Sequence, residues 1–319
     1  MLFRRPLRSV MLANPRYMSA YVLGVAQAMG LRGDWHRQVS LFDDAASIDR
    51  QIAEMAPDVI WTHMAAWPPP GATTAEDVAS ILGRWKRRGA VVFFHDGDPR
   101  DRTITVDMPA SFSMALLNRA VPPGPFWGIP WKRWPYAAMV QREMAAPGPV
   151  THDLLFAGAL RRDKEGEPGL YGERTELVWE LHRRLWPRMA ITSPGGGDIN
   201  NRMHVADIVG TTHAVLGYGR PEINGWVDTR VFQWPGAGGL LIHDDDGGFL
   251  SPGEHYLRFE SGPTLDATVE SVLRALHQAK DADAAWAIRR RAFTHVQQHH
   301  TWVNRVDDAL APFFGGRSD

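Results

Sequence analysis

Short apolar segments alternate with amphipathic, helix-like segments along most of this chain. In the first half, strands are predicted at residues 7–13, 38–42, 58–63 and 90–95. Helices are predicted between them at about 17–30, 45–56 and 74–89. Short strands separated by helices at this spacing are typical of a parallel sheet that helices cover on both faces. The sequence therefore predicts an α/β fold.

A segment rich in proline and glycine, roughly 121–150, interrupts this alternation. The pattern then restarts, with strands predicted at 153–158, 189–194, 213–219, 238–244 and 255–260 and helices at 172–185, 264–279 and 283–312. A chain of 319 residues is also too long for one typical core. We therefore predict two tandem Rossmann-like domains, 1–145 and 146–319, with a ligand-binding cleft between them at the carboxyl ends of the strands.

Composition excludes several classes of site. The sequence has no cysteine, which excludes disulfides, thiolate zinc sites and cysteine nucleophiles. No apolar run approaches the about 18 residues that a transmembrane helix needs. No signal-like segment is evident near the first residue, so a cytoplasmic location is predicted. Residues 1–150 hold 17 Lys/Arg against 13 Asp/Glu, a mild basic excess that leaves an anionic partner such as DNA open.

The stretch "FFHDGDPR" at 93–100 ends a predicted strand with three titratable side chains, His95, Asp96 and Asp98. An imidazole with a neighbouring carboxylate suits general acid–base catalysis, so these three are the predicted catalytic residues. Asp96 and Asp98 also have the spacing of a divalent-metal motif that could hold Mg²⁺ or Mn²⁺. The third interpretation is a Gly-Asp-Pro turn whose acids cap the next segment.

The stretch "FAGALRRDKEG" at 156–166 follows the first predicted strand of the second half. Gly158 would let the backbone approach a ligand, and Arg161, Lys164 and Arg174 could neutralise a diphosphate. The alternative is a solvated, charged loop. In the first half, Asn14, Arg16 and His63 lie at the ends of predicted strands and are candidate ligand contacts.

Several familiar motifs are missing. The chain has no G-x-G-x-x-G after its first strand, no P-loop, no G-x-S-x-G and no H-E-x-x-H. Nicotinamide dehydrogenase, P-loop, serine hydrolase and zincin chemistry therefore lack their usual signatures.

The stretch "DTRVFQWPGAGGLLIHDDDGGFLSPGEHYLRF" resembles the C-terminal domain of two-domain GT-B glycosyltransferases, in particular the CgeB/YkvP-like branch of the group 1 enzymes. The matching residues are Arg230, Phe232, Pro235, Gly238, Asp244, Phe249, Pro252, Gly253, Glu254 and Tyr256. "DLLFAGAL" and the closing "HHTWVNRVDDAL" are similar to other family segments, so the resemblance covers about 153–310. Where the retaining members usually carry a glutamate that holds the ribose, this chain has Gln233.

The resemblance implies a glycosyltransferase that moves a sugar from a nucleotide-diphosphate donor to a hydroxyl acceptor. It places Gly158, Arg230, Gln233, Asp244 and Asp245 on the donor side and the first domain on the acceptor side, with closing helices that cross back to that first domain. No cofactor besides the donor is required, and no bound metal is predicted. The acceptor could be a polysaccharide, a protein, a metabolite or a modified DNA base. The alternatives are a non-catalytic nucleotide- or sugar-binding relative and a metal-dependent transferase that uses Asp96 and Asp98.

Overall fold

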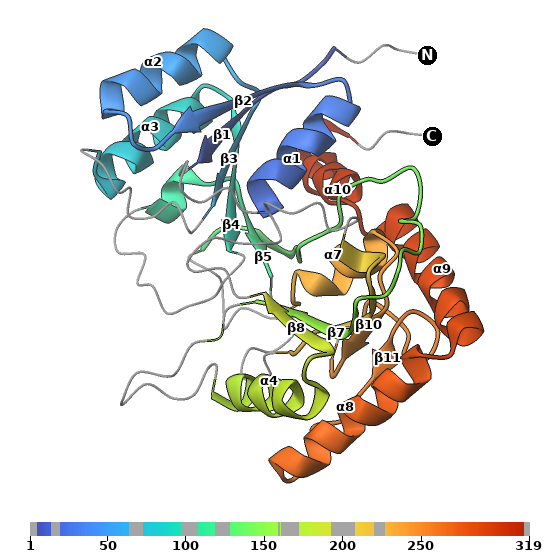
Figure 1. Cartoon of the computed structure of the whole chain (residues 1–319). Helices are drawn as coiled ribbons and strands as arrows, with labels where there is room; N and C mark the ends of the chain where they lie inside the picture. The colour runs from blue at the N-terminus through green and yellow to red at the C-terminus, as the bar shows by residue number, and fades with distance from the viewer. Residues whose placement is uncertain are drawn as a thin grey trace. The chain divides into compact units, whose positions relative to one another are not determined.

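A computed structural model describes residues 5–13, 20–63, 73–96, 108–118, 128–158, 160, 172–192, 208–219, 227–245 and 247–315. The chain forms two compact units. The first unit contains Met1–Tyr136 together with Trp302–Asp319, and the second is the continuous segment Ala137–Thr301. Each unit is built on its own parallel sheet (Figure 1).

The first unit has a six-stranded sheet in the order β2-β1-β3-β4-β5-β6. Its strands are β1 (Arg8–Ala13), β2 (Trp35–Ser40), β3 (Val59–His63), β4 (Val91–Asp96), β5 (Met114–Leu117) and β6 (Trp131–Arg133). Every neighbouring pair is parallel. The helices of this unit are α1 (Ala20–Leu31), α2 (Ala45–Met55), α3 (Ala75–Arg87), the 3₁₀ turn η2 (Met108–Ser111) and α10 (Trp302–Phe314).

Local sequence explains these helices. α3 begins with a capping box, in which Thr74 accepts from the Asp77 amide and Asp77 accepts from the Thr74 amide. Its apolar residues recur at helical spacing, so one face is buried against the sheet. That buried face consists of Val78, Ile81, Leu82 and Trp85.

Helix α1 differs because it is apolar on nearly all sides. Figure 1 shows it beside α10, the last helix of the chain. The closest approach is at Gly24, where a Cβ atom would overlap the ring of the fully buried Trp302. Glycine is therefore required here by the close approach of two helices, not by backbone conformation.

We expect Gly24→Ala to lower the free energy of unfolding by about 1–2 kcal/mol. Overpacking a core costs about 1–3 kcal/mol, whereas the better helix propensity of alanine returns at most about 1 kcal/mol. Gly30→Ala in the same helix is the matched control, because a Cβ atom there has no neighbour within 4 Å. Urea unfolding of both variants measures the effect, and equal stability of the two would contradict the proposed overlap.

The second unit has a five-stranded parallel sheet in the order β11-β10-β9-β7-β8. Its strands are β7 (His152–Ala157), β8 (Met189–Thr192), β9 (Thr212–Leu216), β10 (Leu241–His243) and β11 (Leu257–Arg258). Its helices are α4 (Gly172–Leu185), α7 (Arg230–Gly236), α8 (Leu265–Ala279) and α9 (Ala282–His299). Leu154, Phe156 and Leu216 of the strands pack with Leu177 and Leu181 of α4 in one apolar core.

The two sheets share one strand order. Counted from its own first strand, each runs 2-1-3-4-5, and the first unit adds β6 at one edge. The direction of the chain along the sheet therefore reverses between β1 and β3 in one unit and between β7 and β9 in the other. In open α/β sheets, ligands bind outside the carboxyl ends of the strands at such a reversal.

The α/β fold with two Rossmann-like sheets confirms the sequence-based prediction. Several details differ from it. Strands β5 and β6 were not predicted. The helix predicted at 283–312 is two helices, α9 and α10, because Thr301 forms a bridge with Ala138 where the chain leaves the second unit. The units divide after Tyr136 instead of residue 145. The grouping of α10 with the first unit agrees with the expected closing helix that crosses back to it. Within the described ranges, none of the helices has the length and apolar character needed to cross a membrane.

Candidate functional site

The reversal point of the second sheet brings three predicted donor-side residues together. Gly158 directly follows β7, and a Cβ atom there would lie 2.5 Å from Nη1 of Arg230. The guanidinium of Arg230 lies 5.3 Å from the ring centroid of Phe156, and that of Arg174 lies 5.9 Å from the same centroid. Two cationic side chains thus flank one aromatic ring at the end of β7.

Arg230 is held firmly. It is 5% exposed, and its guanidinium donates to the carbonyl oxygen of Ala157 and to a carboxylate oxygen of Asp228. The other carboxylate oxygen of Asp228 accepts from the Arg230 amide at 2.9 Å. Asp228 itself is buried, so the pair forms a desolvated ion pair at the start of α7. This pair fixes the end of β7 to α7.

Gln233 lies one turn after Arg230 on α7, on the same side of the helix. Its side chain is buried, and its Oε1 has no hydrogen-bond partner among the described residues. Buried carbonyl oxygens almost always accept a hydrogen bond. Gln233 therefore offers an unused acceptor beside the cationic cluster.

A second polar group lies at the carboxyl ends of β9 and β10. Asp244 accepts from the Gly219 amide at 2.6 Å, and its Oδ1 lies 3.0 Å from Nδ1 of His243. The hydroxyl of Tyr218 donates to Glu173 in the first turn of α4 at 3.3 Å. These contacts join the loop after β9 to the end of β10 and the start of α4.

Burial and neighbouring charges shift the pKa values of Asp244 and Tyr218. Burial opposes ionisation of Asp244, but His243 and the backbone amides of Gly219 and Asp245 outweigh it and hold the pKa of Asp244 below its ordinary value. Burial, together with the carboxylates of Glu173 and Asp244, raises the pKa of Tyr218 to about 12. Around neutral pH the site thus carries an ionised Asp244 and an un-ionised Tyr218 hydroxyl that donates hydrogen bonds.

The other donor-side candidates are placed less centrally or fall outside the described residues. Asp245 is exposed, and its carboxylate accepts from the Gly247 amide at 2.9 Å in a turn. Arg161 and Lys164 lie outside the described residues.

In the first unit, His63 and His95 are neighbours in register at the ends of β3 and β4. Their ring centroids are 5.1 Å apart. Tyr21 of α1 stacks on His95 with centroids 4.3 Å apart, and Trp134 meets the same imidazole edge-on at 5.3 Å. His95 is 0% exposed, so its imidazole sits inside an aromatic cluster.

This environment keeps His95 neutral. Burial lowers the pKa of His95 well below its ordinary value, the imidazole of His63 lowers it further, and a backbone contact with Trp134 acts in the opposite direction. Burial also raises the pKa of Tyr21 well above its ordinary value. A neutral imidazole has a free ring nitrogen that can accept a proton, although a pKa this low makes it a weaker base than an exposed histidine. The side chain of Asp96 and residues Asn14, Arg16 and Asp98 lie outside the described part of the chain.

Buried histidines in this unit predict an acid-sensitive stability. Burial lowers the pKa of His36 to about 4, and His95 shifts in the same direction. Because the unfolded chain binds protons near pH 6.5 and the folded chain does not, we expect stability to fall as the pH drops from about 6.5 towards 4. Carboxylates such as Asp58, whose pKa is lowered, act below this window.

Urea unfolding at pH 7 and pH 5 measures this loss. His36→Asn keeps a polar group near Ser9, whose hydroxyl lies 2.6 Å from Nδ1 of His36, and removes the titrating ring. The free energy of unfolding should differ less between pH 7 and pH 5 in this variant than in the wild type. An unchanged difference would assign the pH dependence to other groups.

Within the described ranges, no group of three or more His, Asp or Glu side chains is placed to hold a metal ion. Histidines do gather at the end of α9. The Nε2 atoms of His295 and His300 lie 3.3 Å apart, and the ring of His255 stacks on that of His295.

Sequence inspection did not single out Glu173 and Asp228, two side chains of the second unit that organise the candidate site. Tyr218 and His243 lie at predicted strand ends, where topology predicts ligand contacts. Asp228 lies one residue before Thr229, the N-cap of α7, and its carboxylate accepts from the Arg230 amide. Nothing in the sequence pattern indicates its pairing with Arg230.

Comparison with known proteins finds a family that part of the chain resembles. Residues 155–311, slightly less than half of the chain, match a family model described as glycosyl transferase-like. No curated protein sequence matches the chain. The structure is similar to that of Anabaena Alr3699/HepE, determined in complex with UDP and glucose, with 12% sequence identity, a TM-score of 0.54 and coverage of 96% of this chain and 100% of that one.

A second similar structure is that of Acinetobacter baumannii MurG, with 11% identity, a TM-score of 0.47 and coverage of 97% of this chain and 100% of that one. The likeness to HepE shows the fold. The fold is that of GT-B glycosyltransferases, and the matched family segment contains Arg174, Arg230 and Gln233. The match of residues 155–311 to the glycosyl transferase-like model agrees with the predicted transferase class.

Proposed function

We propose that this protein transfers a sugar from a nucleotide-diphosphate donor to a hydroxyl group, and that the second unit binds the donor. The observation that carries the proposal is the cluster of Gly158, Arg174 and Arg230 at the reversal point of the second sheet, inside the segment that matches the transferase family. Glycosyl transfer releases a nucleoside diphosphate. Cations and helix amides at this point stabilise the charge that develops on it.

The donor nucleotide is the first quantity to measure. The HepE structure contains UDP and glucose, so UDP leads a thermal-shift panel with GDP, dTDP and ADP. Binding to the folded state raises the melting temperature as the ratio of ligand to Kd grows. We expect UDP to give the largest shift, and turnover of the matching nucleotide sugar should release that diphosphate. No shift with any member of the panel, with no nucleotide release, would contradict the proposal.

Gln233 supplies a sharper test. We expect Gln233→Leu to weaken nucleoside diphosphate binding about tenfold, because a ribose hydroxyl of the nucleotide would lose the Oε1 atom as its hydrogen-bond acceptor. Protein stability should not fall, because the substitution removes a buried acceptor that the protein itself leaves unused.

Gln297→Leu is the matched control. The amide of Gln297 is satisfied within the protein, donating to Met139 and Gly236 and accepting from the Gln141 amide. Its loss should lower stability without changing nucleotide affinity. Calorimetric titration and urea unfolding of both variants separate the effects. Unchanged affinity in Gln233→Leu would remove this residue from the donor site.

In the proposed mechanism, the first unit receives the acceptor and His95 removes a proton from its hydroxyl group. The low pKa of His95 keeps the imidazole unprotonated, and His63 lies beside it. We also propose that the protein belongs to the CgeB/YkvP-like branch, because the motifs of its second half resemble that branch. Asp96 and Asp98 assist His95 in this proposal, without a required metal.

A further inference from the structure

Helix α4 carries an exposed aromatic stripe, which consists of Trp179, His182 and Trp186. The first two residues lie at positions i and i+3, and Trp186 follows the last residue of the helix at i+7, so all three face the same side. The ring centroids are 5.8 Å apart between Trp179 and His182 and 5.2 Å apart between His182 and Trp186. Trp179 is 54% exposed and Trp186 is 70% exposed.

Such a stripe needs an explanation. Single exposed hydrophobic residues are normal, but contiguous exposed aromatic surface marks an interaction site. The opposite side of α4, including Leu177, Val178 and Leu181, already supplies the core contact of this helix. The stripe therefore contributes nothing to the fold that would require indole rings at these positions.

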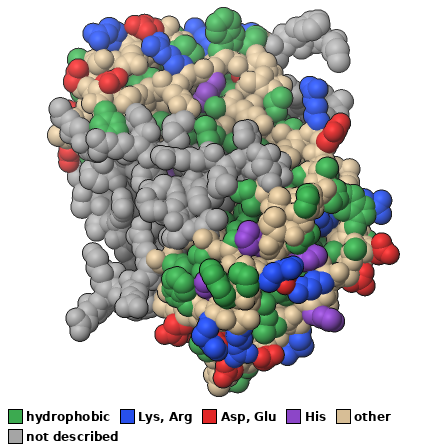
Figure 2. Space-filling view, in the orientation of Figure 1, with side chains coloured by type: hydrophobic (Ala, Val, Ile, Leu, Met, Phe, Trp, Pro, Cys, Tyr) green, Lys and Arg blue, Asp and Glu red, His purple; other side chains and the backbone are tan. Residues whose placement is uncertain are grey.

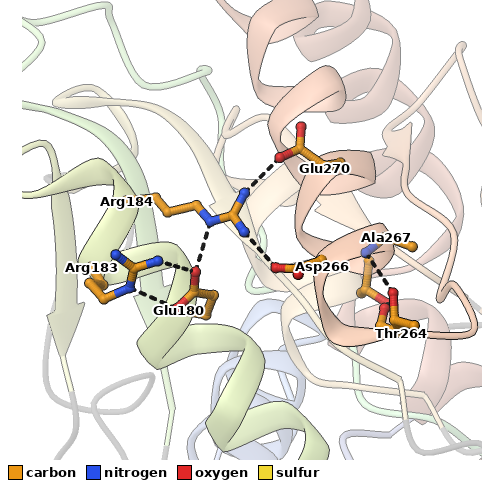
Figure 3. A network of polar contacts seen from close by, with 8 residues as sticks. Glu180, Arg183, Arg184, Thr264, Asp266, Ala267 and Glu270 are labelled. Atoms are coloured by element: carbon orange, nitrogen blue, oxygen red, sulfur yellow. Dashed lines mark hydrogen bonds and ion pairs between the residues drawn. The ribbon is translucent and has the colours of Figure 1, made fainter.

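The charges around the stripe identify the kind of ligand. Arg183 pairs with Glu180 at 2.6 Å. Arg184 joins Glu180 to Asp266 and Glu270 of α8, and Figure 3 shows this network between the two helices. In Figure 2, basic and acidic side chains are interspersed over the visible surface of the second unit. A lipid surface or a polyanion would gain little here, because each of these arginines already has an acidic partner.

The same side chains suit hydroxyl groups. Arg183, Asp266 and Glu270 are more than half exposed and offer donors and acceptors together. Sugar hydroxyls both donate and accept hydrogen bonds, and the C–H faces of a pyranose ring pack on indole rings. The spacing of the three aromatic rings is comparable with the length of one pyranose unit. The ring planes are inclined by 90° between Trp179 and His182 and by 61° between His182 and Trp186, so the two exposed indoles offer faces of different orientation to an uncharged chain of sugars.

We propose that the aromatic stripe of α4 binds a neutral glycan chain. The stripe starts five residues after Arg174, about 7–8 Å along the helix axis, and leads away from the carboxyl end of the sheet. It would hold an oligosaccharide on the surface of the donor-binding unit without taking part in the chemistry. The inference deepens the proposed function, because it names the acceptor or product class as a polymer of uncharged sugars.

Affinity electrophoresis of the full chain through gels that contain dextran, laminarin, soluble starch or galactomannan tests this proposal. At least one polysaccharide should retard the wild-type protein. Trp179→Ala/Trp186→Ala should abolish the retardation. Trp35→Ala is the matched control, because Trp35 is a similarly exposed indole, 66% exposed, in the first unit. It should migrate like the wild type. Thermal unfolding of each variant checks that it is folded.

The outcomes distinguish this inference from the proposed function. No retardation by any of the polysaccharides, or retardation that survives in the double variant, would overturn the glycan site. Stripe-dependent binding to phosphatidylglycerol vesicles, or stripe-dependent self-association, without glycan binding would assign the surface to another partner and would equally overturn it. The UDP shift on the same wild-type sample tests the donor site independently. Glycan binding without a thermal shift with any nucleotide would support the glycan site and contradict the transferase proposal.

Discussion

Replacing Arg230 by methionine is expected to lower the free energy of unfolding by about 3–5 kcal/mol. The substitution leaves Asp228 as an unpaired, buried carboxylate, and breaking a buried ion pair from one side carries a penalty of this size. It also removes the bond to the carbonyl oxygen of Ala157 at the end of β7. Urea unfolding gives the total loss, and hydrogen exchange of β7 and α7 assigns it to the second unit.

The double variant Asp228→Asn/Arg230→Met separates charge from packing. If the loss comes from an unpaired charge, Asp228→Asn should restore part of the stability lost in Arg230→Met. Arg183→Met is the control for loss of an arginine from an exposed pair, and it should change stability little. A small loss in Arg230→Met would show that water reaches Asp228 in the folded protein.

The second large effect is expected at His95. His95→Phe should reduce turnover by about 10²–10⁴-fold, the usual contribution of a general base. Phenylalanine conserves an aromatic ring against Tyr21 and Trp134, so the variant should fold. The substitution also removes an imidazole that stays neutral in the folded protein and binds a proton in the unfolded chain at acidic pH. Below about pH 6.5, the variant should therefore be no less stable than the wild type, although its activity is lower.

Initial rates with a nucleotide sugar, together with unfolding at pH 5 and pH 7, measure both consequences. His277→Gln provides the control, because His277 is an exposed histidine on α8, remote in the chain from this cluster. Nucleoside diphosphate affinity should be the same in all three proteins. Full turnover in His95→Phe would show that the buried imidazole serves packing, with the catalytic base elsewhere.

The fold could be predicted because it depends on patterns that local physics controls. Apolar runs of five or six residues separated by amphipathic helices admit few arrangements, and capping residues such as Thr74 mark the helix starts. β5 and β6 could not be found in this way. They are short, and β6 lies in a segment dominated by proline and glycine, where neighbouring strands decide the pairing.

The candidate site could be predicted in position but not in detail. Strand ends identified Gly158, Asp244, His63 and His95, because parallel sheets bring these ends to one edge. The buried pair of Asp228 and Arg230 depends on contacts between the second unit's first strand and its α7 helix, more than seventy positions apart in the chain. Side-chain exposure could not be predicted either, because the letters "HD" at the end of an apolar run do not reveal that Tyr21 and Trp134 enclose His95.

The bridge between Ala138 and Thr301 has a consequence for modularity. The Ala138 amide donates to the carbonyl oxygen of His300 at 2.9 Å, so the two ends of the second unit are fastened to each other. That unit is thus an insertion with adjacent ends, a geometry that allows excision or circular permutation. We expect residues 137–301 to fold alone. Residues 1–136 would lack α10, and removing Trp302 would uncover Tyr21 and the aromatic cluster that surrounds His95.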